Sequence, residues 1–242
     1  MVILAFQAAT TVEGVLDRVP AEVCGRTPVL LVADDASTDD TVSRARSWSE
    51  RTGRPLEVLV QTTNRGYGGN QKAAYRWARE HGHDIVVLVH ADAQYPPEHV
   101  ERLVAPLLDG RADAAFGSRL MQPGGARAGG MPWIRLLANR GLTTYLNAAS
   151  GGHLTEWFSG YRAYRMATLE AARFETLPDG FDFDSEIILR ILDDGGRIVE
   201  AAMPTHYGDE ISRVPLVRTG LMALVHGARH LRTRRGRAQR NG

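Results

Sequence analysis

The chain has 242 residues, of which 43% are hydrophobic and 24% charged, and its formal net charge is +1. This composition is close to that of average soluble globular proteins and the length suits one large domain, which excludes a disordered chain, a collagen and a coiled coil. A single cysteine, Cys24, excludes an intrachain disulfide and a cysteine-rich zinc site, and it favours a reducing, cytoplasmic location.

Short runs of β-branched and aliphatic residues alternate with segments of helical spacing. We expect strands at residues 2–6, 29–33, 56–60, 85–90 and 114–116, separated by helices at 10–19, 37–52, 69–82 and 96–110. Strands that are apolar on both faces and separated by single helices indicate a mostly parallel sheet with helices on both sides. Further along, the sequence predicts a glycine-rich loop at 121–132, helices at 132–148 and 181–194, and a last strand at 198–203.

Clusters of polar residues follow the predicted strands. Gln7 follows the first strand and Asp34 and Asp35 end the second, while the third, fourth and fifth lead into NRGYGGNQK, HADAQYPPE and GSR. In an open α/β sheet, ligands bind beyond the carboxyl ends of the strands. We therefore expect these clusters to form a single site.

Two adjacent carboxylates, Asp34 and Asp35, stand before a helix start in the segment ADDASTDDT. Acidic residues at a helix start can cap it and oppose its dipole. Carboxylates can also bind ribose hydroxyls or the N–H edge of a base, and we favour this second interpretation because capping does not require two of them. The glycines of NRGYGGNQK match neither the dinucleotide nor the P-loop pattern, so a plain turn explains Gly66 as well as a ligand contact does.

The segment HADAQYPPE contains a candidate metal site. In an extended segment, Asp92 and Gln94 would project to the same side, with Ala91 and Ala93 pointing away. Oxygen ligands of this kind favour Mg²⁺ or Mn²⁺, completed by substrate phosphates and water. His90 is either a further ligand or a structural residue at the strand end.

Nine segments, in this order along the chain, resemble the family-2 glycosyltransferases of GT-A fold, specifically the dolichyl- or polyprenyl-phosphate sugar synthases. They are VILAFQAATTVEGVL, ADDASTDDT, NRGYGGNQKAAY, HADAQYPPE, GSR, WIRLLANR, EWFSGYRAYR, FDFDSEI and PTHYGDEIS. The resemblance implies a Rossmann-like, three-layer α/β fold with a mostly parallel central sheet. It places a glycosyltransferase domain at residues 1–213, followed by an amphipathic helix and basic tail at 214–242.

The resemblance also implies roles for individual residues. The donor nucleotide-sugar would contact Gln7, Asp34, Asp35, Gly66, Lys72 and His206, the last standing where the family generally has an arginine. The metal ion would be held by Asp92, Gln94 and His90, although the family usually has an aspartate in place of His90. The acceptor would be bound by Arg119, Arg135, Asn139 and Ser159, with a solvated helix arginine as the alternative for Arg135. Asp92, Glu156 and Arg119 would be the catalytic residues.

The implied reaction is the inverting, metal-assisted transfer of a sugar from a UDP- or GDP-sugar to a polyprenyl phosphate. One alternative acceptor is a soluble sugar or natural-product hydroxyl, which would need a general base; Glu156 is the first candidate and Glu186 the second. A second alternative, suggested by His90 and His206, is an inactive nucleotide-sugar-binding subunit. The sugar, the nucleotide and the oligomeric state stay open.

The last 14 residues contain six arginines and no acidic residue, which leaves a net charge of −5 on the rest of the chain. Such a segment is typical either of a solvated terminus or of contact with an anionic membrane surface. It has no aromatic residues to stack on bases, so nucleic acid is not an expected partner. We expect a cytoplasmic protein that associates peripherally with a membrane if the basic tail binds one.

Overall fold

The computed structural model describes residues 1–204 and 216–240. The strands of the described part are β1 (Val2–Ala5), β2 (Leu31–Asp34), β3 (Glu57–Val60), β4 (Ile85–His90), β5 (Ala114–Ser118), β6 (Arg162–Arg165) and β7 (Ile198–Ala202). They form one sheet in the order β3-β2-β1-β4-β6-β5-β7. All neighbours pair in parallel except β6, which is antiparallel to both β4 and β5.

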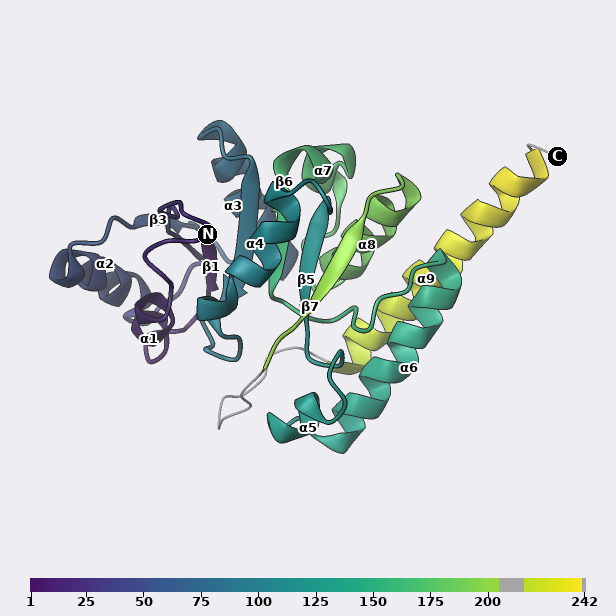
Figure 1. Ribbon diagram of the computed structural model, residues 1–242, viewed down its shortest axis with the longest axis horizontal. Coiled ribbons are helices and arrows are strands. Elements are labelled where there is room, and N and C mark those ends of the chain that lie inside the picture. Colours follow the sequence, from purple (N-terminus) through teal and green to yellow (C-terminus); the bar gives the residue numbers. More distant parts are fainter. Residues whose placement is uncertain (205–215, 241–242) are drawn as a thin grey trace.

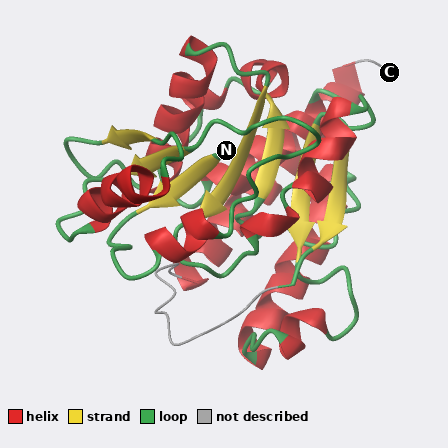
Figure 2. Ribbon diagram, turned by 60° about the vertical axis from the view of Figure 1, so that its left-hand side comes forward, coloured by secondary structure: helices red, strands yellow, loops and turns green. Residues whose placement is uncertain are grey.

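Helices cover both faces of this sheet (Figures 1 and 2). They are α1 (Val12–Asp17), α2 (Thr41–Thr52), α3 (Tyr67–Glu80), α4 (Glu101–Leu108), α5 (Gly125–Ala128), α6 (Trp133–Ser150), α7 (Met166–Ala171), α8 (Phe183–Asp193) and α9 (Leu216–Arg240), with 3-10 turns η1 (Pro97–His99) and η2 (Phe174–Thr176). The predicted three-layer α/β architecture is confirmed.

The sheet has a hydrophobic core on each side because successive side chains of a strand point to opposite faces. In β1, Val2 and Leu4 belong to the core shared with α3, α7 and α8, whereas Ile3 and Ala5 belong to the core shared with α1, α2 and α4. All four residues are buried. This two-sided burial explains why the inner strands are continuous apolar runs in the sequence.

Strand β6 was not among the expected strands, because arginines at both of its ends hide it from a hydrophobic pattern. Arg162 is only 1% exposed. Its guanidinium lies 3.2 Å from a carboxylate oxygen of Asp184 in α8, and it donates hydrogen bonds to the carbonyl oxygens of Trp157 (2.9 Å) and Ser159 (2.6 Å). A charge-paired arginine therefore occupies a position that a sheet of this kind usually fills with an aliphatic residue.

Helix α9 lies beside α6 (Figure 1). The Tyr145 hydroxyl of α6 donates a 2.9 Å hydrogen bond to the carbonyl oxygen of Leu224 in α9. The arginine-rich end, expected as a tail, continues this helix to Arg240. In the described part of the chain, no helix combines the length and the apolar character needed to cross a bilayer. The expected domain boundary at residue 213 and the donor candidate His206 lie outside the described residues.

An ionic contact joins α9 to the start of α8. The His226 side chain of α9 is buried, pairs with Glu186 through Nδ1, and has its Nε2 3.3 Å from a carboxylate oxygen of Asp182. The bond to Glu186 raises the pKa of His226 above its usual value of 6.5, and the same bond lowers the pKa of Glu186 below 4.5. Burial opposes both shifts but is the smaller effect.

This contact predicts a pH-dependent stability. The raised pKa of His226 makes its contribution complete below pH 6.5 and removes it as the pH rises through the folded-state pKa. The lowered pKa of Glu186 makes its contribution present above pH 4.5 and removes it at lower pH. Thermal melts of the wild type and His226→Asn should therefore differ most between these two values, by about 2–4 °C or about 1 kcal/mol. A difference that stays constant or grows above pH 8 would contradict the assignment.

Candidate active site

A cleft of about 770 Å³ opens at the edge of the sheet where β1, β2 and β4 end. Nine of the predicted site residues line it: Gln7, Asp35, Gly66, His90, Asp92, Gln94, Arg119, Arg135 and Asn139. Asp34, Lys72, Glu156, Ser159 and Glu186 do not line it. Residues from five strand ends and from α6 thus meet in one cavity, as the positions of the polar clusters in the sequence predicted.

The two adjacent carboxylates at the end of β2 lie in different surroundings. Asp34 is fully buried and accepts a 2.9 Å hydrogen bond from the backbone N–H of Ser37, so it holds the turn before α2. Asp35 lines the cleft and accepts a 2.7 Å bond from the N–H of Arg65. Burial raises the pKa of Asp35, although the N–H groups of Arg65 and Gly66 counteract it. Of the two residues, Asp34 therefore stabilises the turn, and Asp35 is the one that faces the cleft.

The glycines of the loop before α3 make room for another part of the chain. The N–H groups of Gly68 and Gly69 donate to the carbonyl oxygen of Asp179, at 2.8 and 3.1 Å. A Cβ added to Gly68 would lie 2.6 Å from the carbonyl oxygen of Pro178. Of these glycines, Gly66 lines the cleft, with a φ of +79°.

Lys72 belongs to the same contact between α3 and the 177–179 segment. Its Nζ donates a 2.8 Å hydrogen bond to the carbonyl oxygen of Leu177 and forms an ion pair with Asp179. Because it is engaged there and does not line the cleft, the structure gives it a structural role rather than the predicted contact with the donor.

The candidate metal residues follow β4 in a turn. The expected extended segment is wrong, because Ala93 has a left-handed φ of +61° and Asp92 accepts a 3.1 Å hydrogen bond from the N–H of Gln94. Both Asp92 and Gln94 nevertheless line the cleft. Burial alone would raise the pKa of Asp92, but the protonated form of the His90 ring, the N–H of Gln94 and the Arg119 charge together lower it.

The candidate metal ligands fit a cation that is also bound by a substrate. His90 Nδ1 and an Asp92 carboxylate oxygen are 3.8 Å apart, and Gln94 adds an amide on the same cleft. Among the residues that the structure describes, no group of three or more His, Cys, Asp or Glu side chains is placed to hold a metal ion. A divalent ion here would therefore need oxygen atoms of a bound phosphate to complete its coordination.

Glu156 lies behind the cleft wall and holds Arg119 in place. It is 1% exposed, and its carboxylate accepts 2.7 Å hydrogen bonds from the backbone N–H and Nε of Arg119 and from the amide of Asn139. Arg119 also donates to the carbonyl oxygen of Phe158 at 3.0 Å and lies over the Tyr95 ring. A carboxylate so engaged, and closed off from the cleft, has no free access to a substrate proton.

The remaining candidates differ in position. Ser159 is buried, and its hydroxyl accepts a 3.4 Å bond from the N–H of Tyr161. Glu186, the second candidate base, pairs with His226 of α9.

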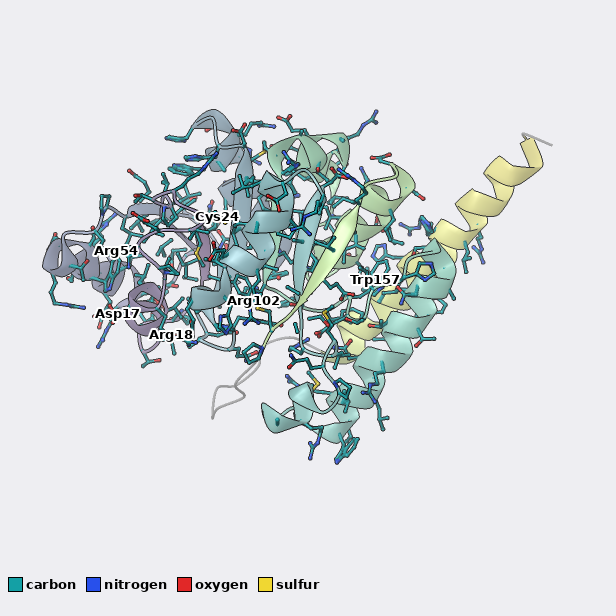
Figure 3. The ribbon with its side chains drawn as sticks, in the orientation of Figure 1. Asp17, Arg18, Cys24, Arg54, Arg102 and Trp157 are labelled. Carbon is teal, nitrogen blue, oxygen red and sulfur yellow. The ribbon has the colours of Figure 1, made fainter. Side chains whose placement is uncertain are left out.

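The segment that contains Glu156 is joined to α6 by a tryptophan. The buried Trp157 donates a 2.8 Å hydrogen bond to Asn147 of α6 and lies near that helix in Figure 3.

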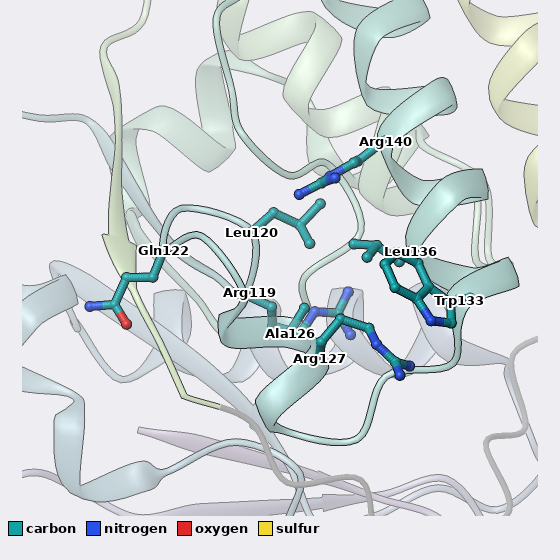
Figure 4. A pocket seen from close by; sticks show the side chains of 9 residues that line it. Arg119, Leu120, Gln122, Ala126, Arg127, Trp133, Leu136 and Arg140 are labelled. Atoms are coloured by element: carbon teal, nitrogen blue, oxygen red, sulfur yellow. The ribbon is translucent and has the colours of Figure 1, made fainter.

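A second, smaller hollow of about 120 Å³ adjoins Arg119, between the 119–127 segment and the start of α6 (Figure 4). The Arg127 guanidinium lies 4.7 Å from the centre of the Trp133 ring, and Arg140 reaches the hollow from α6. Arg135, in contrast, lines the main cleft from the same helix. Arginines thus gather where α6 begins.

Sequence reasoning gave no role to two residues that support the site, Tyr67 and Asp184. The Tyr67 hydroxyl lies 3.1 Å from both the His90 ring and the Asp184 carboxylate, and Tyr67 lines the cleft. Both lie within quoted segments, NRGYGGNQKAAY and FDFDSEI. Nothing in the local pattern shows that segments more than a hundred residues apart make this contact.

Comparison with known proteins identifies the class. The sequence profile described as Glycosyl transferase family 2 matches residues 1–172. An undecaprenyl-phosphate mannosyltransferase of Micrococcus luteus is 34% identical over 175 residues, which are 71% of this chain and 69% of the relative. A polyprenol monophosphomannose synthase of Mycolicibacterium smegmatis is 30% identical over 172 residues, 71% of this chain and 64% of the relative.

The fold is similar to that of glucosyl-3-phosphoglycerate synthase from Mycobacterium tuberculosis, solved with Mn²⁺, UDP-glucose and phosphoglyceric acid. The TM-score is 0.65 and the identity 24%, and the match covers 97% of this chain and 78% of that one. The fold is that of the GT-A glycosyltransferases. The chain belongs to glycosyl transferase family 2.

The buried Arg119–Glu156 pair predicts a large stability effect. Glu156→Ala would leave the guanidinium without its counter-charge, so the free energy of unfolding should fall by about 3–5 kcal/mol. Denaturant titration measures this loss, and replacing both partners with apolar residues should recover much of it. The exposed Arg18–Glu98 pair is the control, for which Glu98→Ala should cost less than about 1 kcal/mol. Equal losses for both variants would contradict the structural role of Glu156.

Proposed function

We propose that this enzyme transfers a sugar, with inversion, from a nucleotide-sugar to a polyprenyl phosphate with the help of Mg²⁺ or Mn²⁺. The observation that carries the proposal is the single cleft that joins Asp35, Asp92 and the arginines Arg119 and Arg135. The two relatives are named for mannosyl transfer to such lipids, so mannose is the first sugar to test.

The donor would occupy the part of the cleft that β1, β2 and β4 form. Asp35 and Gln7 are suited to bind the ribose or base of a nucleoside, either uridine or guanosine. Asp92, Gln94 and His90 would hold the divalent ion, which when bound stabilises negative charge on the departing diphosphate. The lowered pKa of Asp92 keeps this residue as a carboxylate, the form that binds a cation.

The acceptor would lie near Arg119 and Arg135. A phosphate acceptor is already an anion, so it can attack the anomeric carbon without a general base, whereas a hydroxyl acceptor requires one. In the described part of the chain, Asp35 and Asp92 are the only carboxylate residues that line the cleft. Since Glu156 and Glu186 are engaged elsewhere, this arrangement supports a phosphate acceptor over the soluble hydroxyl alternative.

The acceptor proposal includes peripheral contact with the membrane that carries the lipid. Helix α6 exposes Trp133, Ile134 and Leu137 near its start, and α9 exposes Leu221 and Leu224. Six arginines follow residue 228 in the sequence. Apolar side chains combined with basic residues favour association with an anionic membrane surface, which in a cytoplasmic protein would be the inner face of the membrane.

Thermal melts with a panel of UDP- and GDP-sugars, with and without Mn²⁺, test donor binding, because a ligand that binds the folded state raises the melting temperature. Release of the nucleoside diphosphate on addition of a polyprenyl phosphate then tests turnover. Donor binding without release under any divalent ion would instead support the inactive binding subunit.

Asp92→Asn should lower kcat by about 10²–10³-fold, because the variant loses the negative charge that would hold the divalent ion at the leaving diphosphate. The melting temperature should change little, because the side chain lines an open cleft. Asp109→Asn, at an exposed carboxylate that pairs with Arg111, is the matched control. Unchanged kcat in Asp92→Asn would remove this residue from the mechanism.

Arg135→Ala should raise KM for the polyprenyl phosphate about tenfold or more, since a hydrogen bond to a charged group contributes about 1.5–3 kcal/mol. KM for the donor should stay the same. Arg140→Ala on the same helix is the control, because Arg140 reaches the small hollow and not the main cleft. The same change of KM for the polyprenyl phosphate in both variants would contradict the acceptor assignment. Transfer to a soluble hydroxyl acceptor that is equally fast in Arg135→Ala and the wild type would also contradict it.

A further inference from the structure

His90 is tied to a buried ionic group through one tyrosine. Its Nε2 lies 3.1 Å from the hydroxyl oxygen of Tyr67, and the same hydroxyl lies 3.1 Å from an Asp184 carboxylate oxygen. Asp184 is 8% exposed and sits at the start of α8. Through the Tyr67 hydroxyl, His90 on the cleft is therefore linked to the buried Asp184.

The hydrogen-bonding partners of Asp184 fix the direction of the chain of bonds. Its other carboxylate oxygen accepts a 3.1 Å hydrogen bond from the Gln71 amide and lies 3.2 Å from the buried Arg162 guanidinium. A carboxylate paired with arginine accepts hydrogen bonds and donates none. The one hydroxyl proton of Tyr67 must therefore point to Asp184.

It follows that the Tyr67 oxygen can only accept a hydrogen bond from the His90 ring. The neutral ring then carries its proton on Nε2 and has a lone pair on Nδ1. Nδ1 is the nitrogen that lies 3.8 Å from the carboxylate of Asp92, a residue that lines the cleft.

The position of the ring is restricted as well. A Cβ added to Gly160 would lie 2.3 Å from Cε1 of His90, so the imidazole packs directly against the backbone there. The Tyr67 ring meets the imidazole edge-on, with centroids 5.4 Å apart at an interplanar angle of 88°. The glycine and the tyrosine together restrict the position of the ring.

We propose that Tyr67, anchored by Asp184 and Arg162, is a positioning residue that keeps His90 in the Nε2–H form and directs Nδ1 to a divalent cation beside Asp92. A histidine ligand held by a hydrogen bond from its other nitrogen is a recurrent arrangement in metal sites. This inference rests on the proposed function, because the cation is the divalent ion that would also bind the diphosphate of the nucleotide-sugar. Because a nitrogen ligand suits transition metals, the site should prefer Mn²⁺ to Mg²⁺.

The first test reads the tautomer directly and needs no activity. Long-range ¹H–¹⁵N spectra of the metal-free protein with ¹⁵N-labelled histidine distinguish the two neutral forms, and the His90→Ala spectrum identifies the His90 signals. The wild type should show the proton on Nε2. Tyr67→Phe should shift the ring toward a mixture of both forms. Tyr75→Phe is the matched control, since Tyr75 donates to Gln71 in the same network without touching His90.

The second test measures Mn²⁺ affinity from the signal of free Mn²⁺ in electron paramagnetic resonance, with UDP and with GDP. Tyr67→Phe should weaken Mn²⁺ binding about 10–100-fold, the usual effect of removing a partner of a metal-bound histidine. Mg²⁺ binding, measured by competition, should weaken less. Tyr75→Phe should bind Mn²⁺ as the wild type does. In a His90→Ala background, Tyr67→Phe should cause no further loss.

The outcomes separate this inference from the proposed function. A proton on Nδ1 in the wild type, no Mn²⁺ binding by the wild type, or equal Mn²⁺ affinity in wild type and Tyr67→Phe would each overturn the inference. A further loss in the His90→Ala background would also overturn it, since Tyr67 would then act by another route. The expected tautomer and Mn²⁺ affinities without sugar transfer would support the inference and reject the proposed function alone.

Discussion

The buried ion pair between Arg162 and Asp184 connects the parts of the protein on which the cleft depends. Arg162 belongs to β6, the one antiparallel strand of the described sheet, and it binds carbonyl groups of the segment that leads into this strand. Asp184 lies in the first turn of α8 and accepts hydrogen bonds from Gln71 and Tyr67 of α3. A charge removed from water is stable only with its partner and hydrogen bonds in place, so this pair requires β6, α8 and α3 to assemble together.

That dependence also explains which parts of the fold could be predicted from the sequence. Strands such as Ile85–His90 are apolar on both faces, and their pattern alone locates them to within a few residues. Strand β6 reads RAYR, and its first arginine becomes a core residue only through Asp184, which is 22 residues away. The local pattern does not contain that partner, so the strand could not be predicted from it.

In the candidate site too, some features follow from the local sequence and others depend on contacts between distant residues. The rule that ligands bind beyond strand ends correctly brought Asp35, Asp92 and Arg119 into one cleft. It could not separate residues that face the cleft from those that hold the wall, because adjacent or motif-related residues point in different directions. Asp34 holds a turn, and Glu156 positions Arg119 from behind. These roles depend on side-chain direction and on contacts between distant segments, which only the folded chain defines.

The most direct test of the account is a crystal structure of the protein with GDP or UDP, Mn²⁺ and a non-hydrolysable sugar analogue. The account predicts the nucleoside against Asp35, the diphosphate and the ion against Asp92 with His90 Nδ1 as a ligand, and the sugar directed toward Arg119. A nucleotide bound in the small hollow beside Arg127 and Arg140, or an ion that contacts neither Asp92 nor His90, would contradict it.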